Sequence, residues 1–342
     1  MKNMQSRPIH ELLLRNTSLV LFVVVFLYFG VQAPRFFDPE NISNIIKQAA
    51  FTGIVAVGMT FVLLTAGIDL SVGSNMYLSA LFVGYLMDNP GIGVIPALIA
   101  ALLIGAVYGA INAFFIVKMK IAPFIVTLAT LVAGRGLGTA ITESHGVEYP
   151  RSLLTFGASS VLGIPMPIIV FAMVVLGAHF VLTRTAFGRQ VYAVGNDIEA
   201  ARKAGINTDR IIASVYIICG MCAGLGGFIL IAQIARLTQP FARGKELDVI
   251  AAAVLGGTSL FGGVGSSYGA VIGSVLIQMV QSGLIYTEVN LYLQPMVQSA
   301  IIFLAVFFDG LRDSRLNRLK RRHIRTEDVA RQTEAVPLSG SG

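Results

Sequence analysis

Residues 47–87 read KQAAFTGIVAVGMTFVLLTAGIDLSVGSNMYLSALFVGYLM, and they place one acidic residue, Asp69, between two long apolar runs. Lys47, at the first position, is the only other charged residue in this stretch. Crossing a hydrocarbon core about 30 Å thick takes roughly 20 helical residues. We therefore expect two neighbouring membrane spans, 47–66 and 70–87, of which the second is short.

The composition of the whole chain points the same way. Of its 342 residues 55% are hydrophobic and 13% are charged, and the mean hydropathy is +0.76. A soluble domain carries about 25% charged residues, so soluble globular and disordered proteins are excluded. Long unbroken apolar runs also exclude an outer-membrane barrel, whose strands alternate over roughly 10 residues. The expected fold class is an all-α membrane protein with many spans, embedded in a lipid bilayer.

About ten spans fit the apolar runs. They are 17–33, 47–66, 70–87, 94–117, 122–141, 166–183, 211–234, 247–264, 267–286 and 293–308. The first follows a basic segment, as a signal peptide would, but it is long and Pro34 follows it, so we expect an uncleaved helix. Asp38 and Pro39 are typical of a helix start and predict a short interfacial helix before the second span.

Charge predicts the orientation. With both chain ends inside, 18 of the 25 Lys and Arg residues fall on the cytoplasmic side and six on the outer side, with Arg135 within a span. Positive charge concentrates on the cytoplasmic side of membrane proteins, which also accounts for the net charge of +7 without a nucleic-acid partner. The expected organisation is a cytoplasmic N-terminus (1–16), a transmembrane domain (17–309) with a cytoplasmic loop (184–210), and a disordered cytoplasmic tail (310–342).

A weak internal repeat accompanies this topology. An offset of 177 residues carries Gly67–Val72 onto Gly244–Val249, and it carries the second span onto the seventh and the fourth onto the ninth. Five spans separate the copies, so spans 2–5 and 7–10 would form an inverted repeat, as in many transporters. Chance similarity between short apolar stretches is the alternative.

The polar residues around Asp69 allow two interpretations. A carboxylate at membrane depth is costly unless it is paired, capping or solvated. Asp69 either caps the third span by accepting N–H bonds from its first turn, or it forms a gate or a sugar contact, and both roles can coexist. Candidate pathway or gate residues are Asp69, Ser71, Ser74, Asn75, Thr127, Arg135, Glu246, Asp248 and Thr258.

The other members of that set are equally open to a structural interpretation. Arg135 is either a snorkelling or ion-paired residue or part of the pathway. Glu246 and Asp248 either cap a helix or form an outer docking surface. The run 256–265 is rich in glycine and favours close packing or a broken helix over phosphate binding. Polar positions inside spans are more often interhelical hydrogen bonds than ligand contacts; they include Asn75, Asn112, Thr127, Thr130, Gln233, Gln278 and Gln281.

No catalytic or metal constellation stands out. Cys219 and Cys222 have C-x-x-C spacing, but they fall within an apolar span without the βαβ context of a redox motif. The four histidines show no metal-like spacing. We expect no catalytic residues, no metal and no cofactor bound by this chain.

The loop 184–210 predicts a helix outside the membrane. Asn196 and Glu199 have the spacing of a capping box, Ala200 and Ala201 favour helix, and Gly205 would end it. Such a helix of about eight residues is marginal alone in water. It would rest on its own protein or on lipid, or it would dock into a cytoplasmic partner.

Several of these stretches together resemble one family, the permease subunits of bacterial ABC importers for ribose, xylose, arabinose and galactose. The similar stretches follow one another in the family's order over roughly residues 17–310. They are 56–60 (AVGMT), 67–74 (GIDLSVGS), 124–130 (FIVTLAT), 134–136 (GRG), 188–206 and 246–259. Where many members have a second glycine, this chain has Ala66.

The resemblance implies a monosaccharide permease of the bacterial inner membrane that works with other polypeptides. These would be a cytoplasmic ATPase that binds ATP, a periplasmic sugar-binding protein and a second permease, identical or different. The helix within 196–205 would be the coupling helix to the ATPase, with Gly195, Asn196, Asp197, Glu199, Ala200, Ala201 and Gly205 as its residues. A secondary transporter or channel and a membrane-embedded enzyme are the alternatives; few intramembrane acids and the lack of a catalytic cluster weigh against them.

Overall fold

The computed structural model describes residues 17–89, 91–234, 236–238 and 241–300, together with 303 and 307. These residues form mostly helices. In chain order they are α2 (Thr17–Gln32), α3 (Pro39–Leu64), α4 (Val72–Met87), α5 (Val94–Ala113), α6 (Pro123–Thr142), α7 (Arg151–Ala158), α8 (Met166–Arg184), α9 (Ala186–Asn196), α10 (Ile198–Lys203), α11 (Thr208–Ile234), α12 (Lys245–Leu255) and α13 (Ser267–Tyr286). The segments 1–16 and 310–342 lie outside the described residues.

Short elements join the long helices. The 3-10 turn η1 (Pro34–Phe37) precedes α3, and the π-helical turn η2 (Phe114–Lys118) continues α5. Strands β1 (Val147–Glu148) and β4 (Arg236–Leu237) pair antiparallel, as do β2 (Ser160–Val161) and β3 (Ile164–Pro165).

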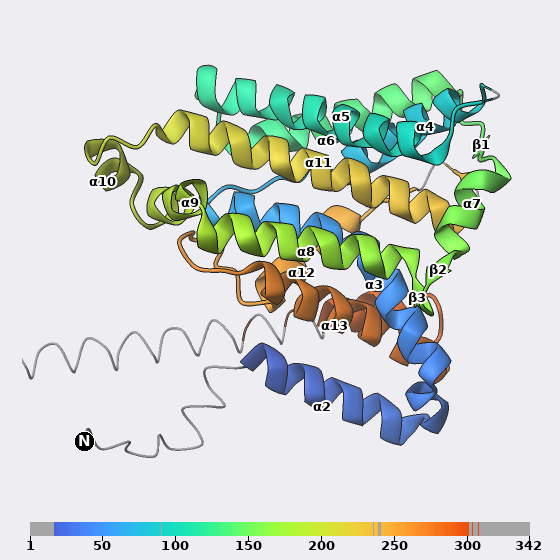
Figure 1. Cartoon of the computed structure of the whole chain (residues 1–342). Helices are drawn as coiled ribbons and strands as arrows, with labels where there is room; N and C mark the ends of the chain where they lie inside the picture. The colour runs from blue at the N-terminus through green and yellow to red at the C-terminus, as the bar shows by residue number, and fades with distance from the viewer. Residues whose placement is uncertain are drawn as a thin grey trace, which may run out of the picture.

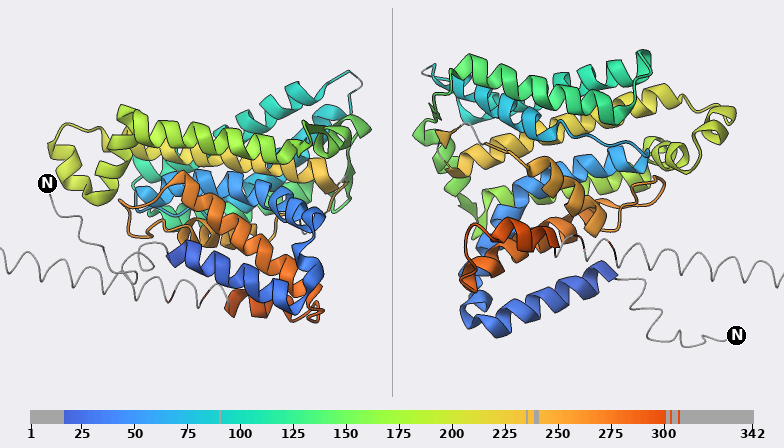
Figure 2. Two further views of the ribbon diagram at one scale, coloured as in Figure 1. Left: turned by 60° about the horizontal axis from the view of Figure 1, so that its bottom comes forward. Right: turned by 180° about the vertical axis from the view of Figure 1, so that it is seen from behind.

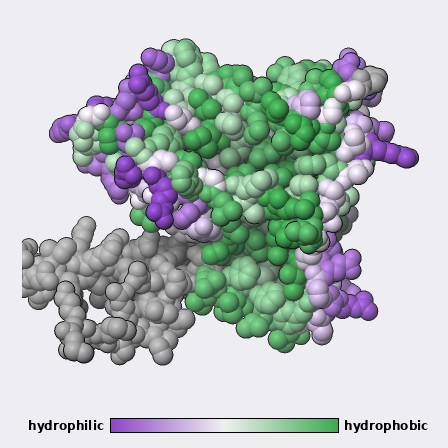
Figure 3. Space-filling model, viewed as in Figure 1, coloured by the Kyte–Doolittle hydropathy of each residue, from purple (hydrophilic) through white to green (hydrophobic). Residues whose placement is uncertain are grey.

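Six helices among the described residues are long and apolar enough to cross a membrane, namely α3, α5 with η2, α6, α8, α11 and α13. The shorter apolar helices α2 and α4 accompany them. Hydrophobic side chains cover a broad belt, and hydrophilic ones gather at its two ends (Figure 3). The chain is therefore an all-α, multi-pass membrane protein, whereas the expected number of ten spans remains a prediction.

The two ends of the bundle carry different elements. At one end α9 and α10 project beyond the long helices, and at the other lie α7 and the short strands (Figure 1). Helix α2 packs beside α13 at the side of the bundle (Figure 2). Helices α3 and α11 are the most buried of the long ones.

Glycines let the interior helices approach closely. A methyl group added to Gly220 of α11 would overlap the carbonyl oxygen of Gly105 on α5, and one added to Gly224 would overlap that of Ala101. In a lipid environment such contacts stabilise helix pairs through van der Waals packing. The small residues in 219–227 therefore place α11 at the centre of the fold.

Two expected elements are wrong. The predicted helix start at Asp38 and Pro39 is confirmed, but α3 continues from Pro39 to Leu64, so this start belongs to the second span and not to a separate interfacial helix, and the Asp38 carboxylate makes no capping bond. The expected span 247–264 is only the short α12, because Gly257, Gly262 and Gly263 adopt φ values of +88°, +87° and +72° that break a helix. Of the last expected span, residues 294–300 are helical, and most of 301–308 lies outside the described residues.

Candidate functional site

The connection between α3 and α4 is folded around the Asp69 carboxylate. Asp69 is 1% exposed, and its Oδ1 accepts hydrogen bonds from the backbone N–H of Ser71 at 2.9 Å and from the Ser71 hydroxyl at 2.6 Å. Helix α4 begins one residue later, at Val72. The Asp69 carboxylate therefore accepts one N–H bond in the first turn of the expected span 70–87, from Ser71, which directly precedes the first residue of α4.

A polar network continues from this connection into two neighbouring helices. The Asn112 side chain on α5 donates to the Ser71 hydroxyl at 2.7 Å and accepts from the Thr130 hydroxyl on α6 at 2.8 Å. The Ser74 hydroxyl lies 2.9 Å from that of Tyr108. We call Asp69, Ser71, Ser74, Asn112 and Thr130 the polar network. It ties α4, α5 and α6 together within the interior.

The remaining polar candidates of the first half also bond within the protein. Asn75 is 1% exposed and donates to the carbonyl of Gly220 on α11 at 3.2 Å. The Thr127 hydroxyl donates to the carbonyl of Pro123, one turn earlier in α6, at 2.9 Å. Interhelical hydrogen bonding accounts for Asn75, whereas Thr127 mainly bonds its own helix.

Arg135 and Glu246 meet in a second cluster. Arg135 donates to the backbone carbonyls of Phe241 at 3.2 Å and Ala242 at 2.9 Å, and its Nη2 lies 3.5 Å from Oε2 of Glu246. The two charged side chains are 19% and 13% exposed. Arg135 therefore fixes the segment before α12 against α6, and it does so beyond the midpoint of α6.

The expected outer docking surface does not fit Glu246. Because this side chain lies against α6 and is largely buried, it presents little surface to a partner. Asp248 is held by Lys245 at 2.9 Å and by the Gln298 amide at 3.2 Å. Thr258 is 2% exposed, and its hydroxyl has no hydrogen-bond partner among the described residues.

An open cavity of about 370 Å³ adjoins Arg135. Its lining comes from α4, α6 and the segment before α12, and consists of Tyr77, Leu131, Val132, Arg135, Gly136, Thr139 and Arg243. Apart from Arg135, sequence reasoning did not find these residues. Nothing in their local pattern marks them, since the cavity brings together three segments that are distant in sequence.

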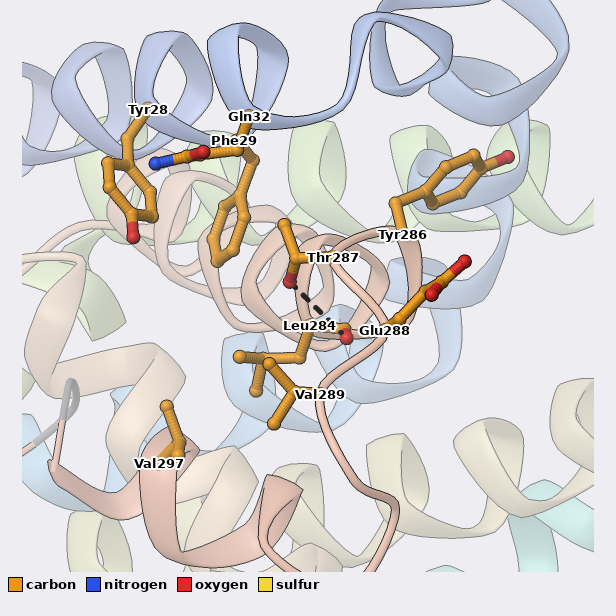
Figure 4. Close-up of a pocket in the computed structure, with 9 residues that line it drawn as sticks. All are labelled: Tyr28, Phe29, Gln32, Leu284, Tyr286, Thr287, Glu288, Val289 and Val297. Atoms are coloured by element: carbon orange, nitrogen blue, oxygen red, sulfur yellow. Dashed lines mark hydrogen bonds between the residues drawn. The ribbon is translucent and has the colours of Figure 1, made fainter.

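A larger cavity of about 530 Å³ lies between the ends of α2 and α13. Figure 4 shows Phe29 and Leu284 lining it, and the Thr287 hydroxyl donating to the Leu284 carbonyl at 3.4 Å. None of the candidate pathway residues lines it.

The loop 184–210 contains two helices rather than one. The Thr185 hydroxyl caps α9 by accepting from the Gly188 N–H at 3.1 Å, and the Asp197 carboxylate caps α10 by accepting from Glu199 and Ala200 at 2.9 and 3.0 Å. Asn196 instead ends α9.

The expected capping box between Asn196 and Glu199 is wrong. Asn196 belongs to the end of α9, and the Glu199 carboxylate pairs with Arg202 at 2.8 Å and does not reach back to Asn196. The prediction that Gly205 ends the helix is confirmed, with φ at +84°. Helix α10 is six residues long, and Ala201 is buried while Ala200 is exposed.

Comparisons with known proteins cover most of the chain. Residues 41–306 match the family described as the branched-chain amino acid transport system permease component. The ribose import permease RbsC of Escherichia coli is 36% identical over 87% of this chain and 94% of its own length. The D-allose permease AlsC and the xylose permease XylH of the same species are 35% and 31% identical, over 86% and 87% of this chain and 91% and 93% of their own lengths. No solved structure matches the chain.

Proposed function

Because the chain belongs to the family of branched-chain amino acid transport system permease components, and to its branch of sugar ABC import permeases, we propose that it forms the membrane pathway for a monosaccharide. Members of this family are transport subunits, and so is this chain, which is not an enzyme. The similarity to the ribose import permease along 87% of the chain carries the proposal. It favours a sugar over an amino acid as the cargo.

The proposed assembly lies in the bacterial inner membrane. A separate cytoplasmic ATPase would bind ATP and drive transport, and a periplasmic binding protein would deliver the sugar. The sequence has no nucleotide-binding motif of its own, which supports a partner as the source of energy. A second permease, most simply a second copy of this chain, would complete the pathway.

The proposed topology has ten spans, both ends in the cytoplasm and an inverted repeat. Helix packing supports the repeat. Helix α11 packs on α4 and α5, while α3, its counterpart at the 177-residue offset, packs on α12 and α13, the counterparts of α4 and α5. The two halves, inserted in opposite orientations, would then enclose the transport pathway between them, as in other transporters built from repeats.

Helix α10 is the proposed coupling helix. It projects beyond the bundle (Figure 1), and its six residues are too few to be stable alone in water. Docking into the ATPase would stabilise it. Charge reversal of Glu199 or substitution of Gly205 should impair coupling to ATP hydrolysis while leaving membrane insertion intact. Unchanged transport in both variants would refute the assignment.

The passage is proposed to run along the cavity beside α6. Arg243 is exposed there, and Arg135 lines the same cavity. Placing an arginine side chain in the hydrocarbon core costs about 2.5–3.5 kcal/mol or more of free energy. The face of the protein around this cavity therefore suits a water-filled passage, closed by a second permease, better than contact with lipid. The exposed apolar side chain of Val132 would contact that second copy.

Two experiments test these proposals. In proteoliposomes with the ATPase and binding protein, sugar uptake should require ATP; uptake that continues without ATP would instead indicate a secondary transporter or channel. For the passage, Gly136→Cys and Gly177→Cys are matched, because an added Cβ at either glycine meets no atom within 4 Å. Gly136→Cys should form disulfide-linked dimers in membranes and Gly177→Cys, on α8, should not; the reverse pattern would place the second copy elsewhere.

A further inference from the structure

Near its C-terminal end, at Gly195, helix α9 touches the rest of the protein through backbone atoms, in addition to the core contacts of its buried Val191 and Val194 side chains. A methyl group added to Gly195 would overlap the carbonyl oxygen of Leu64, the last residue of α3, and would lie 2.6 Å from the backbone nitrogen of Gly263. The Gly263 N–H in turn donates to the Leu64 carbonyl at 3.0 Å. Three backbone segments therefore meet at one point with no side chain between them.

Two further contacts join α9 to residues next to Gly263. The Tyr192 hydroxyl on α9 donates to the carbonyl of Gly265 at 2.8 Å. A Cβ at Gly262 would lie 2.7 Å from the Gly195 carbonyl oxygen and 3.1 Å from the Ala66 nitrogen. We call Leu64, Tyr192, Gly195, Gly263 and Gly265 the glycine joint.

The joint connects three elements with separate roles. Asp197, which caps α10, follows Gly195 by two residues. Leu64 is the last residue of α3 and directly precedes the connection to α4, which contains Asp69. Gly263 lies in the connection from α12, the helix that carries Glu246, to α13. A displacement of α10 would therefore be passed to the connection that contains Asp69 and to the connection after α12, because closely packed interiors have low compressibility and transmit strain.

Resting on the proposed function, we propose that the glycine joint transmits the movement of α10 to the connection 65–71 and to α12, so that Gly195, Gly263 and Tyr192 are positioning residues for coupled transport. Leu64 lies in the first half of the repeat and Gly263 in the second. A single helix would thereby move elements of both halves together.

The test uses the full chain assembled with its ATPase and binding protein. Gly195→Ala should insert, bind the ATPase and allow ATP hydrolysis, while the sugar moved per ATP falls about tenfold, a size typical of coupling free energies. Tyr192→Phe removes one hydrogen bond without adding bulk and should lower the same ratio in the same direction. Gly177→Ala is the control, because a Cβ there meets open space. A wild-type ratio in both Gly195→Ala and Tyr192→Phe would overturn the proposal.

A second measurement does not depend on the cargo. Binding of the ATPase to the wild-type permease should change amide hydrogen exchange in 65–71 and 256–265, and Gly195→Ala should abolish that change. If the wild type shows the exchange response but no ATP-dependent sugar uptake, the joint stands and the proposed function fails. Wild-type uptake without any exchange response in these two segments refutes the joint alone.

Discussion

Arg135 on α6 and Glu246 at the start of α12 form an ion pair within the bundle, with 3.5 Å between Nη2 and Oε2. Glu246 occupies the position that the 177-residue offset assigns to Asp69. Both acids accept a backbone N–H from a residue two positions away, Asp69 from Ser71 and Glu246 from Gly244, but only Glu246 also pairs with an arginine on another helix.

Because Arg135 also bonds two backbone carbonyls, we expect unequal effects of removing Arg135 and Glu246. Glu246→Gln keeps the two carbonyl bonds of Arg135, whereas Arg135→Gln removes the guanidinium that donates to both carbonyls and pairs with the carboxylate. We expect Arg135→Gln to lower the free energy of unfolding by roughly 2–4 kcal/mol and Glu246→Gln by about half of that. Thermal unfolding in detergent measures both. A double variant no worse than Arg135→Gln alone would confirm their coupling, and additive losses would contradict it.

The polar network predicts that the side chain of Asn112 contributes to the stability of the folded protein. Asn112→Ala removes a partner of both Ser71 and Thr130, leaving a buried and a half-buried hydroxyl without that bond. The expected loss is about 1–2 kcal/mol, since single interhelical hydrogen bonds in membranes contribute about 0.6 kcal/mol each and unpaired groups add to the loss. Thr155→Ala, which affects only an exposed bond within α7, is the control. Equal melting temperatures for the two variants would argue against the network.

Hydropathy predicted the long helices because each had to be apolar over its whole length. The expected spans 94–117, 122–141, 166–183, 211–234 and 267–286 agree with α5, α6, α8, α11 and α13 within a few residues. It could not predict where α12 ends, because Val264 and its neighbours are apolar enough to continue a span while left-handed glycines stop it. The cavity beside α6 was also unpredictable, since Tyr77 and Arg243 meet there only through packing.

The backbone conformation at position 66 favours glycine over the alanine present there. Ala66 adopts a left-handed conformation with φ at +58°, which is costly for a residue with a Cβ. Ala66→Gly should therefore raise the free energy of unfolding by about 1 kcal/mol. Ala172→Gly, in the exposed face of α8, should lower it by about the same amount. Opposite shifts in melting temperature are the expected result, and parallel shifts would contradict it.

Tyr149, just before α7, predicts a pH dependence. Its hydroxyl donates to the Ala80 carbonyl at 2.8 Å, and burial raises its pKa above the usual value of about 10. Above about pH 10 the unfolded state loses this proton and the folded state keeps it, so stability should fall with pH by up to about 1.4 kcal/mol per unit. Unfolding of wild type and Tyr149→Phe between pH 8 and 11 measures this contribution. The variant should lack it, and parallel curves for the two proteins would exclude it.

The Asp197 carboxylate caps the N-terminus of helix α10. Substitutions of Asp197 can therefore distinguish the effect of the cap from the effect of its negative charge. Asp197→Ala removes the acceptor for two backbone N–H groups, which should destabilise the six-residue helix by about 1 kcal/mol. Asp197→Asn removes the charge but keeps a capping oxygen of similar rank. If α10 must be helical to engage the ATPase, the alanine variant should bind the ATPase severalfold more weakly and the asparagine variant nearly normally. Equal weakening in both would mean that the charge of Asp197, and not the helix it begins, is what the partner recognises.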